Sequence, residues 1–541
     1  MSLLSTLWRS LRGRWPDWAF LALGGALLAF VCWEACCVRV ITHSPNADYW
    51  EHAAVLRALM QSLLHPGNPQ LVSGATSARY GPQFVLVALL ARAAHTDALG
   101  AMSIAAMLDV VLLLLGIYVF FRRYFDEPIA SVYGLLVMLT SWWVGFRFSN
   151  VYQLTVLPSV ASYPSSTALA LCLLGLALEL GVLRRRVRKP LGLCLLGLCQ
   201  AMTFIVHPLT AMIFIAGSGL LCVSEPHVER RLRFEVLGAS AAGLALSHFW
   251  PYFSPWRVLL GGSGFSAHWL ERSVQAATTR SLADYRHTFY DLPAVLRLLG
   301  LSFLGLLALP YFFLRRARWF VGFGALLMLV PYAVNARIEI PLGHRFLLLA
   351  IFYLQVACVW LLLCLTPGSR LGSTRLARGV PRVLGILAIA TLLTPFVIHN
   401  VWLANHEISP FSRRAKNGPT PIVRYARAAA EIAGPGAVVL ADPVVSWPLP
   451  AFGLKVLVLN HDNPFVADEP ERDWAVSRFL SDASPQEREQ IIERYQVTHV
   501  VLRREPRGSL RDFLANSPRQ PLPAGYILFA LPSRPRQPYR P

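Results

Sequence analysis

The sequence is short of charged residues. Of its 541 residues, 15% are charged and 55% are hydrophobic. A soluble protein of this length could not cover so much apolar surface. Apolar runs of roughly 17–25 residues recur along the chain, and this is the length that a membrane-spanning helix needs. The composition therefore excludes a soluble globular protein and predicts a mainly α-helical polytopic membrane protein.

Several signatures of metal and nucleotide sites are also missing. All nine cysteines lie in or beside apolar runs, with neither a disulfide framework nor zinc spacing. The "GPG" at 434–436 precedes an expected strand, whereas a phosphate loop would open a helix. No repeat of half-chain length stands out, which counts against a transporter built from inverted repeats. We therefore expect no cysteine-bound metal and no nucleotide site.

Acidic residues are scarce, at 30 against 50 basic ones, which gives a net charge of +20. The arginines stand in short clusters between apolar runs, for example at 121–123, 184–189, 229–233 and 315–318. Such clusters are typical of cytoplasmic loops, and they explain the charge better than a nucleic-acid partner does. Abundant Arg, Ala and Leu with few Lys fit a GC-rich bacterium. The expected location is the bacterial inner membrane, with the N-terminus in the cytoplasm.

Placing every arginine cluster in the cytoplasm predicts about eleven membrane spans. They are expected at 18–40, 98–121, 128–146, 165–183, 190–206, 208–223, 235–254, 294–314, 319–335, 345–366 and 383–403. The apolar stretch 80–94 is too short to cross comfortably, so we expect a helix at the outer interface. Residues 1–404 then form the transmembrane domain, with outer loops at 42–97 and 255–293.

Residues 405–541 change in character and are expected outside the membrane, in the periplasm. Helices are predicted at 421–434 and 484–496, and strands at 437–442, 455–460 and 498–504. Alternating helices and strands predict a small α/β extracytoplasmic domain. The closing "PSRPRQPYRP" is expected to form a disordered tail.

The stretch "HSPNADYWEHAAVLRAL" (43–59) directly follows the first apolar run. Its Ser-Pro pair predicts a helix start, after which Asp48, Glu51 and His52 share one helix face. Apolar residues also recur at helical spacing over 45–64, so the helix can lie along the membrane with its polar face toward a cavity. Two other interpretations stay open. The polar residues form a solvated face, or Asp48 and His52 bind a divalent metal ion.

Taken in order, these features resemble the GT-C superfamily of integral-membrane glycosyltransferases, which includes protein mannosyltransferases and aminoarabinose transferases. The resemblance rests on an N-inside first span followed by the acidic helix, and on the outer α/β domain. It also rests on three short motifs, "RYGP" (79–82), "TFIVHPLTAMIF" (203–214) and "GHRFLLLA" (343–350). By architecture it covers most of residues 1–404.

The resemblance implies transfer of a sugar from a polyprenyl-phosphate donor to an acceptor on the outer side of the membrane, with inversion. Such a donor already carries a good leaving group. The enzyme therefore needs a base for the acceptor hydroxyl and positive groups for the departing phosphate. Asp48 matches the family's catalytic base, with Glu51 and His52 as catalytic neighbours. Many family members have Glu directly after this Asp, whereas this chain has Tyr49.

Arg345, in the Arg-aromatic pair before Phe346, resembles the family's basic residue that helps to hold the lipid phosphate, and a guanidinium suits phosphate geometry. Further candidates for substrate binding are Arg79, Tyr80, His207 and His344. His207 precedes Pro208, so it either lines a cavity or caps a break between two helices. No cofactor is implied with certainty, and a divalent metal remains the alternative given above. The expected partners are the lipid bilayer, the lipid-linked donor, and a glycan, lipid or protein acceptor.

Two other functions compete with sugar transfer. A transporter or flippase of a lipid-linked glycan would need charges along a pathway through the spans, and few are there: Glu34, Asp109 and Glu179. A non-catalytic membrane scaffold would show no cost when Asp48 is changed. The tryptophans at 142–143 and 248–250 are expected in an interfacial aromatic belt rather than in a sugar-binding platform.

Overall fold

The computed structural model describes residues 14–38, 48–142, 149–260, 289–315, 319–338, 343–366, 369, 394, 397–398, 401–402, 419–460 and 463–532. These residues are mostly helical, as expected, and the chain divides into two compact units. The first unit comprises Met1–Glu34, Ala106–Phe249 and Ser281–Phe411. The second comprises Ala35–Ala105, Trp250–Arg280 and Ser412–Pro541. The expected first outer loop therefore shares a unit with the C-terminal region.

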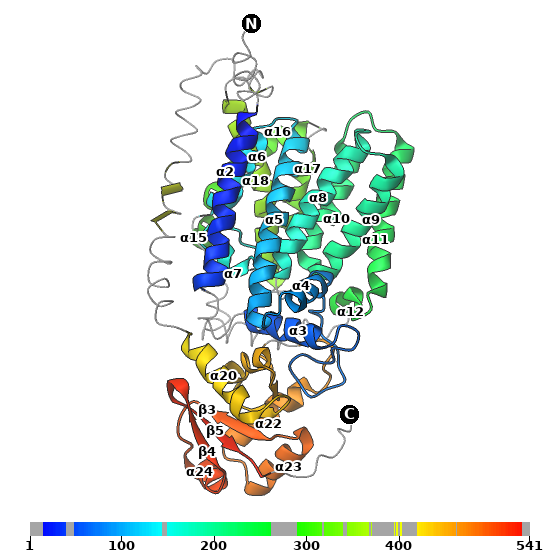
Figure 1. Ribbon diagram of the computed structural model, residues 1–541. Coiled ribbons are helices and arrows are strands. Elements are labelled where there is room, and N and C mark those ends of the chain that lie inside the picture. The colour runs from blue at the N-terminus through cyan, green and yellow to red at the C-terminus, as the bar shows by residue number, and fades with distance from the viewer. Residues whose placement is uncertain are drawn as a thin grey trace. The chain divides into compact units, whose positions relative to one another are not determined.

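The first unit is a bundle of apolar helices (Figure 1). Its helices are α2 (Trp15–Trp33), most of α5 (Ala98–Phe125), α6 (Ala130–Thr140), α7 (Leu157–Val160), α8 (Pro164–Leu183), α9 (Lys189–Val206), α10 (Pro208–Ser224), α11 (Arg230–Leu246), α15 (Leu292–Leu299), α16 (Gly305–Leu314), α17 (Trp319–Ile338) and α18 (Arg345–Leu365). A π-helical turn, Glu34–Val38, follows α2, and short 3-10 helices stand at Ser247–Phe249 and Gly300–Leu304.

Seven helical stretches in the described residues are long and apolar enough to cross a membrane. They are Trp15–Cys37, Ala98–Phe125, Pro164–Leu183, Lys189–Val206, Leu292–Leu314, Trp319–Arg337 and Arg345–Leu365. Each of the seven coincides with an expected span. The chain therefore has the polytopic, mainly helical architecture that its composition predicts.

The other expected spans are shorter helices in the structure or lie outside the described residues. Those at 128–146, 208–223 and 235–254 correspond to α6, α10 and α11, with 11, 17 and 17 residues. The span at 383–403 lies largely outside the described residues. The stretch 80–94 forms α4 (Pro82–Ala93), whose 12 residues give a length of about 18 Å against a hydrocarbon core of about 30 Å. That it does not cross stays a prediction.

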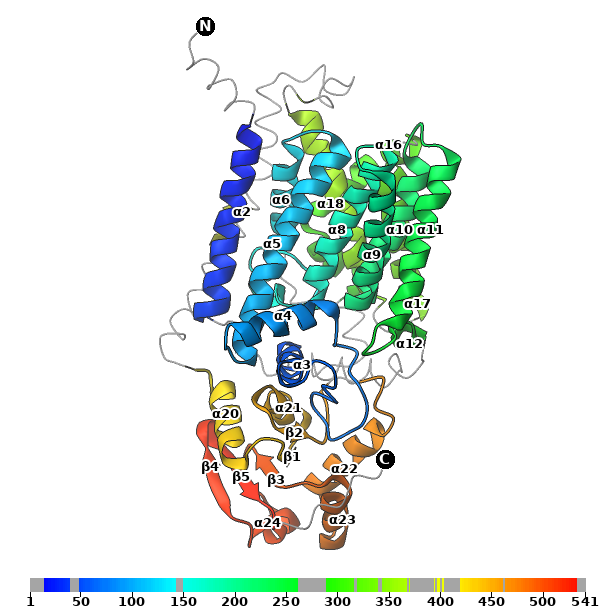
Figure 2. The same cartoon turned by 45° about the vertical axis from the view of Figure 1, so that its right-hand side comes forward.

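Close helix packing holds the first unit together. Helix α18 packs against α6, α16 and α17, and α8 packs against α9 and α10, all in the bundle that Figure 2 shows. Helices α9 and α11 approach closely where Gly197 meets Gly243. A Cβ atom on Gly243 would lie 2.1 Å from the Gly197 carbonyl oxygen, so a larger residue would force the two helices apart.

Three of the arginine clusters expected in cytoplasmic loops, those at 121–123, 184–189 and 229–233, meet at one end of this bundle. Arg184, between α8 and α9, pairs with Glu225, between α10 and α11, at 2.7 Å. Arg186, also between α8 and α9, pairs with Asp126, which follows α5, at 3.0 Å. Lys189 at the start of α9 pairs with Glu235 of α11 at 2.9 Å. Basic loop residues are thus partly neutralised by acids that follow or begin neighbouring helices.

The second unit contains a mixed five-stranded sheet in the order β2-β1-β3-β5-β4. Strand β1 runs parallel to β2 and β3, and β5 runs antiparallel to β3 and β4. The strands are β1 (Val438–Leu440), β2 (Lys455–Val456), β3 (His499–Leu502), β4 (Arg519–Leu522) and β5 (Tyr526–Ala530). The helices are α3 (Tyr49–Gln61), α4, α12 (Pro255–Leu260), α20 (Pro421–Ala433), α21 (Pro443–Ser446), α22 (Glu469–Leu480), α23 (Pro485–Tyr495) and α24 (Gly508–Leu514), with 3-10 turns η7 (Leu449–Phe452) and η8 (Pro523–Gly525).

Residues 68–76, which precede α4, are hydrogen-bonded to the sheet and to the residues around it. Leu71 forms a parallel bridge with Val456, and the Val456 N–H donates to the Gln70 carbonyl at 2.9 Å. The side chains of Asn463 and Arg472 donate to the carbonyls of Thr76 and Val72, at 3.0 and 3.2 Å. The sheet therefore depends on backbone that lies almost 400 residues earlier in the sequence.

The predicted elements of the C-terminal region are partly confirmed. Helices at 421–434 and 484–496 are present as α20 and α23, and strands at 437–442 and 498–504 are present as β1 and β3. The strand predicted at 455–460 is wrong in length, because pairing ends at Val456 and the following buried residues leave the ladder. Helix α22 and strands β4 and β5 were not predicted. Most of the predicted tail lies outside the described residues.

Candidate functional site

The acidic helix α3 begins directly after Asp48. The Asp48 carbonyl accepts the His52 N–H at 3.1 Å, and its carboxylate does not cap the helix. The helix start expected at 44–45 lies outside the described residues. Glu51 is 6% exposed and His52 is 2% exposed, so these two side chains are not part of a solvated face. A buried carboxylate is costly unless it has a partner, which makes its contacts informative.

Glu51 has an ionic partner from the segment before α4. Arg79 Nε lies 3.1 Å from Glu51 Oε2, with the Arg79 side chain 36% exposed and that of Glu51 8% exposed. The structure thus brings together two predicted site residues that are 28 positions apart.

Tyr80 fixes the backbone beside Arg79. Its ring is fully buried, and its hydroxyl donates to the Gly67 carbonyl at 2.8 Å. The Trp250 indole N–H donates to the Tyr80 carbonyl at 2.7 Å. Burial, followed by the neighbouring Tyr252, raises the pKa of the Tyr80 phenol, so the hydroxyl stays neutral. Tyr80 therefore acts as a structural anchor in this arrangement. Trp250 is hydrogen-bonded within the second unit, and its place in an aromatic belt stays a prediction.

His52 packs against an aromatic ring of α4. The centroids of the His52 and Phe84 rings lie 5.2 Å apart. The described residues contain no group of three or more His, Cys, Asp or Glu side chains that could hold a metal ion. The described residues therefore supply no third His, Cys, Asp or Glu ligand for a metal ion at Asp48 and His52.

Arg345 and His344 belong to the first unit, at the start of α18. Arg345 Nη1 donates to Ser149 Oγ at 3.1 Å, and the side chain is half-buried. His344 is 7% exposed, and its ring lies 4.4 Å from that of Phe289. Burial, followed by repulsion from Arg345, holds the pKa of His344 well below its usual range. His344 is therefore neutral at physiological pH, and Arg345 supplies the positive charge of the pair.

His207 serves as a helix cap. Its Nδ1 atom accepts the Thr210 N–H at 3.1 Å, at the first turn of α10. The backbone between α9 and α10 is extended at His207, as expected for a break before Pro208. The structure therefore gives a direct role to the capping interpretation, and substrate binding by His207 stays a prediction.

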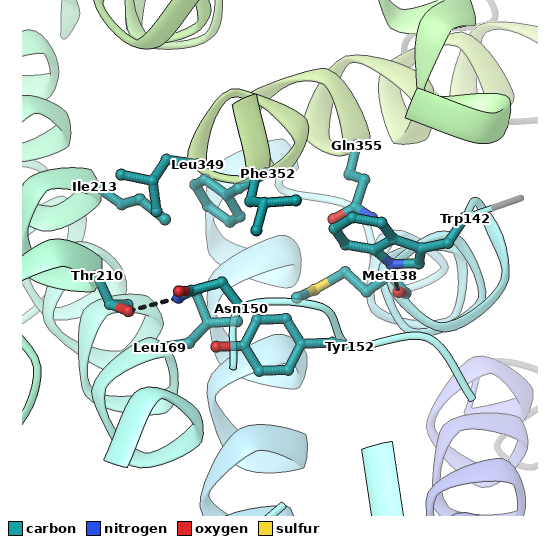
Figure 3. A pocket seen from close by; sticks show the side chains of 11 residues that line it. Met138, Trp142, Asn150, Tyr152, Leu169, Thr210, Ile213, Leu349, Phe352 and Gln355 are labelled. Atoms are coloured by element: carbon teal, nitrogen blue, oxygen red, sulfur yellow. Dashed lines mark hydrogen bonds between the residues drawn. The ribbon is translucent and has the colours of Figure 1, made fainter. Parts of the chain in front are cut away.

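A small pocket in the first unit lies between α6, α8, α10 and α18 (Figure 3). Trp142, Asn150, Tyr152, Thr210 and Gln355 contribute its polar atoms. Asn150 Nδ2 donates to Thr210 Oγ1 at 2.8 Å, and Trp142 is 2% exposed, so it is not an interfacial belt residue. The free volume is about 10 Å³, which is room for roughly one water molecule. This pocket cannot accept a sugar in the form described.

Two buried acids of the bundle, Asp109 and Glu179, make local hydrogen bonds. Thr167 on α8 donates to Asp109 on α5 at 2.6 Å. The Cys222 thiol on α10 donates to Glu179 on α8 at 3.4 Å. Both contacts join neighbouring helices, which is a common use of polar residues inside a membrane bundle.

A scan against family models gives no match, and no curated protein matches the sequence. The structure is nevertheless similar to solved ones. ArnT from Cupriavidus metallidurans bound to undecaprenyl phosphate gives a TM-score of 0.53 at 14% identity, over 94% of this chain and 97% of that one. Arabinofuranosyltransferase AftD from Mycobacteria gives 0.52 at 14% identity, over 94% of this chain and 41% of that one.

The oligosaccharyltransferase of Archaeoglobus fulgidus, tethered with an acceptor peptide, gives a TM-score of 0.51 at 11% identity, over 91% of this chain and 69% of that one. All three proteins are GT-C glycosyltransferases. At these identities the likeness concerns the fold. The chain therefore has the GT-C fold that its sequence resembles.

Proposed function

We propose that this protein transfers a sugar from a polyprenyl-phosphate-linked donor to an acceptor on the extracytoplasmic side of the membrane, with inversion at the anomeric carbon. The main support is the GT-C fold, shared over nearly the full length with an ArnT structure that holds undecaprenyl phosphate. A buried acidic helix that follows the first span adds a candidate base. Fold alone does not define activity, so the chemistry must be tested at named residues.

In this proposal Asp48 is the general base. It accepts the proton of the acceptor hydroxyl as that oxygen attacks the anomeric carbon of the sugar. The bond from this carbon to the phosphate oxygen breaks, and polyprenyl phosphate leaves with the bonding electrons. One displacement inverts the configuration, and no covalent sugar-enzyme bond is needed.

Glu51 has a positioning role in this scheme. Its carboxylate is paired with Arg79 at 3.1 Å and is nearly buried, so it orders the Arg79 side chain and the start of α3. Arg79 retains exposed surface with which to meet the phosphate of the donor. His52, packed on Phe84, supports the same helix turn. A change at Glu51 should therefore cost less than a change at Asp48.

Arg345 is the proposed phosphate ligand of the first unit. A half-buried guanidinium makes stronger hydrogen bonds to phosphate than an exposed one, because less water competes. Ser149 holds one of its nitrogens at 3.1 Å, which limits the rotamers of the side chain. Neutral His344 can donate one hydrogen bond but brings no charge to the leaving group.

The proposed location is the bacterial inner membrane, with the N-terminus in the cytoplasm. The support is the positive-inside rule. The basic connections α8–α9 and α10–α11 meet at one end of the bundle, as loops on one side of a membrane must. The second unit contains the acidic helix and would then face the periplasm.

The test uses the purified full chain in liposomes, with a panel of undecaprenyl-phosphate monosaccharides as donors and envelope extract as the source of acceptor. Sugar transfer is measured together with binding of undecaprenyl phosphate. We expect Asp48→Asn to lower transfer by at least about a hundredfold, the usual size of a general-base contribution, and to leave lipid binding unchanged. Arg345→Ala should weaken binding of undecaprenyl phosphate by about tenfold or more, as well as turnover.

Matched controls separate chemistry from folding. Asp482→Asn changes an exposed acid of the second unit, and Arg337→Ala changes an exposed arginine of the first. Both should retain transfer and binding. Full transfer by Asp48→Asn would remove the catalytic proposal. If the unaltered protein transfers sugar from no donor of the panel and does not bind undecaprenyl phosphate, the proposed function as a whole is wrong.

A further inference from the structure

The second unit contains a cavity that the proposed reaction does not use. Its volume is about 370 Å³, and it is formed by α3, α20, η7 and the first residues of α5. That volume is within the range of small-molecule sites, about 300–1,000 Å³. Two arginines, two carboxylates and one aromatic ring line it: Arg57, Arg427, Asp97, Glu431 and Phe452.

Arg57 places a partly buried cation at this cavity, where Asp97 attracts it without forming an ion pair. Within the described residues its guanidinium makes no hydrogen bond or ion pair, and its Nε atom is buried. The guanidinium lies against Gly453, where a Cβ atom would come within 2.5 Å of Nη2. Gly453 also has a φ of +101°, which favours glycine. Packing therefore orients this side chain, and its donors are not used by other described residues.

Arg427 also lines the cavity, and Lys455 lies near Arg57 but outside the lining. Arg427 lies on the exposed side of α20, and among the described residues it has no hydrogen bond or ion pair from its guanidinium. Lys455 is partly buried, and its ammonium donates to the Asn68 carbonyl. Burial, followed by repulsion from Arg57, lowers the pKa of Lys455 to about 8. Like charges held together in this way favour an anion between or beside them.

The remaining lining argues against a simple anion site. Asp97 and Glu431 would repel an inorganic anion, but their oxygens can accept hydrogen bonds from hydroxyl groups. Phe452 offers an apolar face, and its ring centroid lies 6.4 Å from that of buried Trp50. Carboxylates, guanidinium groups and a ring face around one cavity suit a ligand that has several hydroxyls, one apolar face and one negative group. A sugar that carries a carboxylate or phosphate has this chemistry.

We propose that this cavity binds an acidic saccharide, with Arg57 and Arg427 on its anionic group and with Asp97 and Glu431 on its hydroxyls. Resting on the proposed function, the saccharide is a remote part of the acceptor glycan. Arg57 lies nine residues beyond Asp48, which is about 13 Å along the axis of α3 and on the opposite side of the helix. The cavity is therefore separate from the proposed base, and it raises the local concentration of acceptor by holding a second part of it.

The test measures binding to the full chain in nanodiscs, without any donor, by isothermal titration calorimetry. The probes are galacturonic acid trisaccharide, galactose 6-phosphate and neutral galactose trisaccharide. We expect the two acidic probes to bind more tightly than the neutral one. The stronger of the two identifies the carboxylate or the phosphate as the anionic group. Arg427→Gln, on an exposed helix face, should weaken acidic-probe binding by about tenfold or more. Arg57→Gln should do the same, and the matched control Arg424→Gln should not.

A second variant separates a saccharide site from an anion site. Glu431→Gln removes a repulsive charge, so an anion site would bind inorganic phosphate more tightly after the change. A saccharide site instead loses a strong acceptor, and the acidic trisaccharide should bind several-fold more weakly. Equal binding of neutral and acidic probes, tighter trisaccharide binding by Glu431→Gln, or no binding of any probe would overturn the inference.

The failure of this inference is distinguishable from that of the proposed function. Asp48→Asn should bind the acidic probes as the unaltered protein does, because Asp48 does not line the cavity. If the unaltered protein transfers sugar but binds none of the acidic probes, only the cavity proposal is wrong. Probe binding without transfer from any donor would leave a saccharide-binding protein and remove the transferase.

Discussion

Helix α8 of the first unit packs against α9 and α10, its immediate successors along the chain, whereas Val456 of the second unit hydrogen-bonds to the carbonyl of Gln70. Much of the packing in the first unit is thus between neighbours in sequence, although α18 also packs on the distant α6. In the second unit, side chains reach carbonyls 387 and 400 residues away. Each unit is assembled from three stretches of the chain. Packing between neighbouring helices can be recognised in the sequence from apolar runs, whereas contacts between distant segments give no such pattern.

The two units also place their arginines differently. In the first, Arg184 and Arg186 form ion pairs in the connections between helices. In the second, Arg472 and Arg488 are 2% and 0% exposed and donate to backbone carbonyls. A buried arginine costs free energy unless its donors are satisfied, so the second unit depends on these few residues far more than the first depends on any one loop arginine.

The largest expected effect is a difference in reagent access between the second unit and a basic connection of the first. In a background free of native cysteine, Gln490→Cys in the second unit should react with a membrane-impermeant maleimide in intact cells. Arg188→Cys, in the basic α8–α9 connection, should react only after permeabilisation. Both positions are exposed, so access to the reagent depends on the side of the membrane rather than on burial. The readout is a gel shift of the labelled protein.

A cysteine-free background is required because Cys36, Cys37 and Cys194 are exposed. Labelling at 188 in intact cells would reverse the positive-inside assignment. Labelling at neither position before permeabilisation would place the second unit in the cytoplasm, and with it the candidate base.

The next effect concerns the long-range contacts of the second unit. Arg472→Met should destabilise it by about 2–4 kcal/mol, because the Val72 carbonyl and the Asp468 carboxylate lose their partner. Hydrogen exchange should rise at residues 68–72 as well as in α22. Arg488→Met should destabilise the unit similarly, but exchange should rise around Phe479 and Ser481, whose carbonyls it serves.

Arg478→Met is the matched control, because its partner Glu487 and the arginine itself are more than a third exposed. It should change exchange in neither segment, as exposed ion pairs contribute little. Equal exchange at 68–72 in Arg472→Met and Arg478→Met would mean that the early segment is held without Arg472. Exchange in α18 of the first unit should stay unchanged in all three variants.

The contrast between the units explains what the sequence could predict. Apolar runs located seven spans, amphipathic spacing located α20, and cap residues located α23, because these signals are local. Helix α22 has a largely polar sequence, and β4 contains Pro521 and is mostly exposed, so neither shows the usual pattern. Candidate site residues were found singly, whereas the Glu51–Arg79 pair and the Arg57 cavity depend on tertiary contacts. No spacing in the sequence encodes those contacts.

A smaller effect should appear as a pH dependence confined to the second unit. The pKa of Lys455 is lowered from 10.5 to about 8 in the folded chain, by burial first and Arg57 second. Between these values the unfolded chain binds the proton and the folded chain does not. Stability should therefore rise with pH from about 8 to about 10.5, by on the order of 1–3 kcal/mol.

Denaturant titrations of the second unit, followed by hydrogen exchange in β3, would measure this slope. Lys455→Met should abolish it. Arg57→Gln should reduce it without removing it, since burial is the larger cause of the lowered pKa. A slope of the same size in Lys455→Met would assign the pH dependence to another group.

The smallest effect compares one helix cap from each unit. His207 Nδ1 caps α10 of the first unit, and Thr420 Oγ1 caps α20 of the second by accepting the Val423 N–H at 3.3 Å. His207→Ala and Thr420→Ala should each cost about 1 kcal/mol, seen as faster exchange in the first turn of the affected helix. His207→Asn should restore most of that loss, because an Asn oxygen can accept the same N–H. If His207 is a cap alone, His207→Asn also keeps full sugar transfer per folded molecule. Restored exchange protection with transfer still reduced would instead show that the imidazole contacts substrate, and His207 would join Arg345 as a ligand supplied by the first unit.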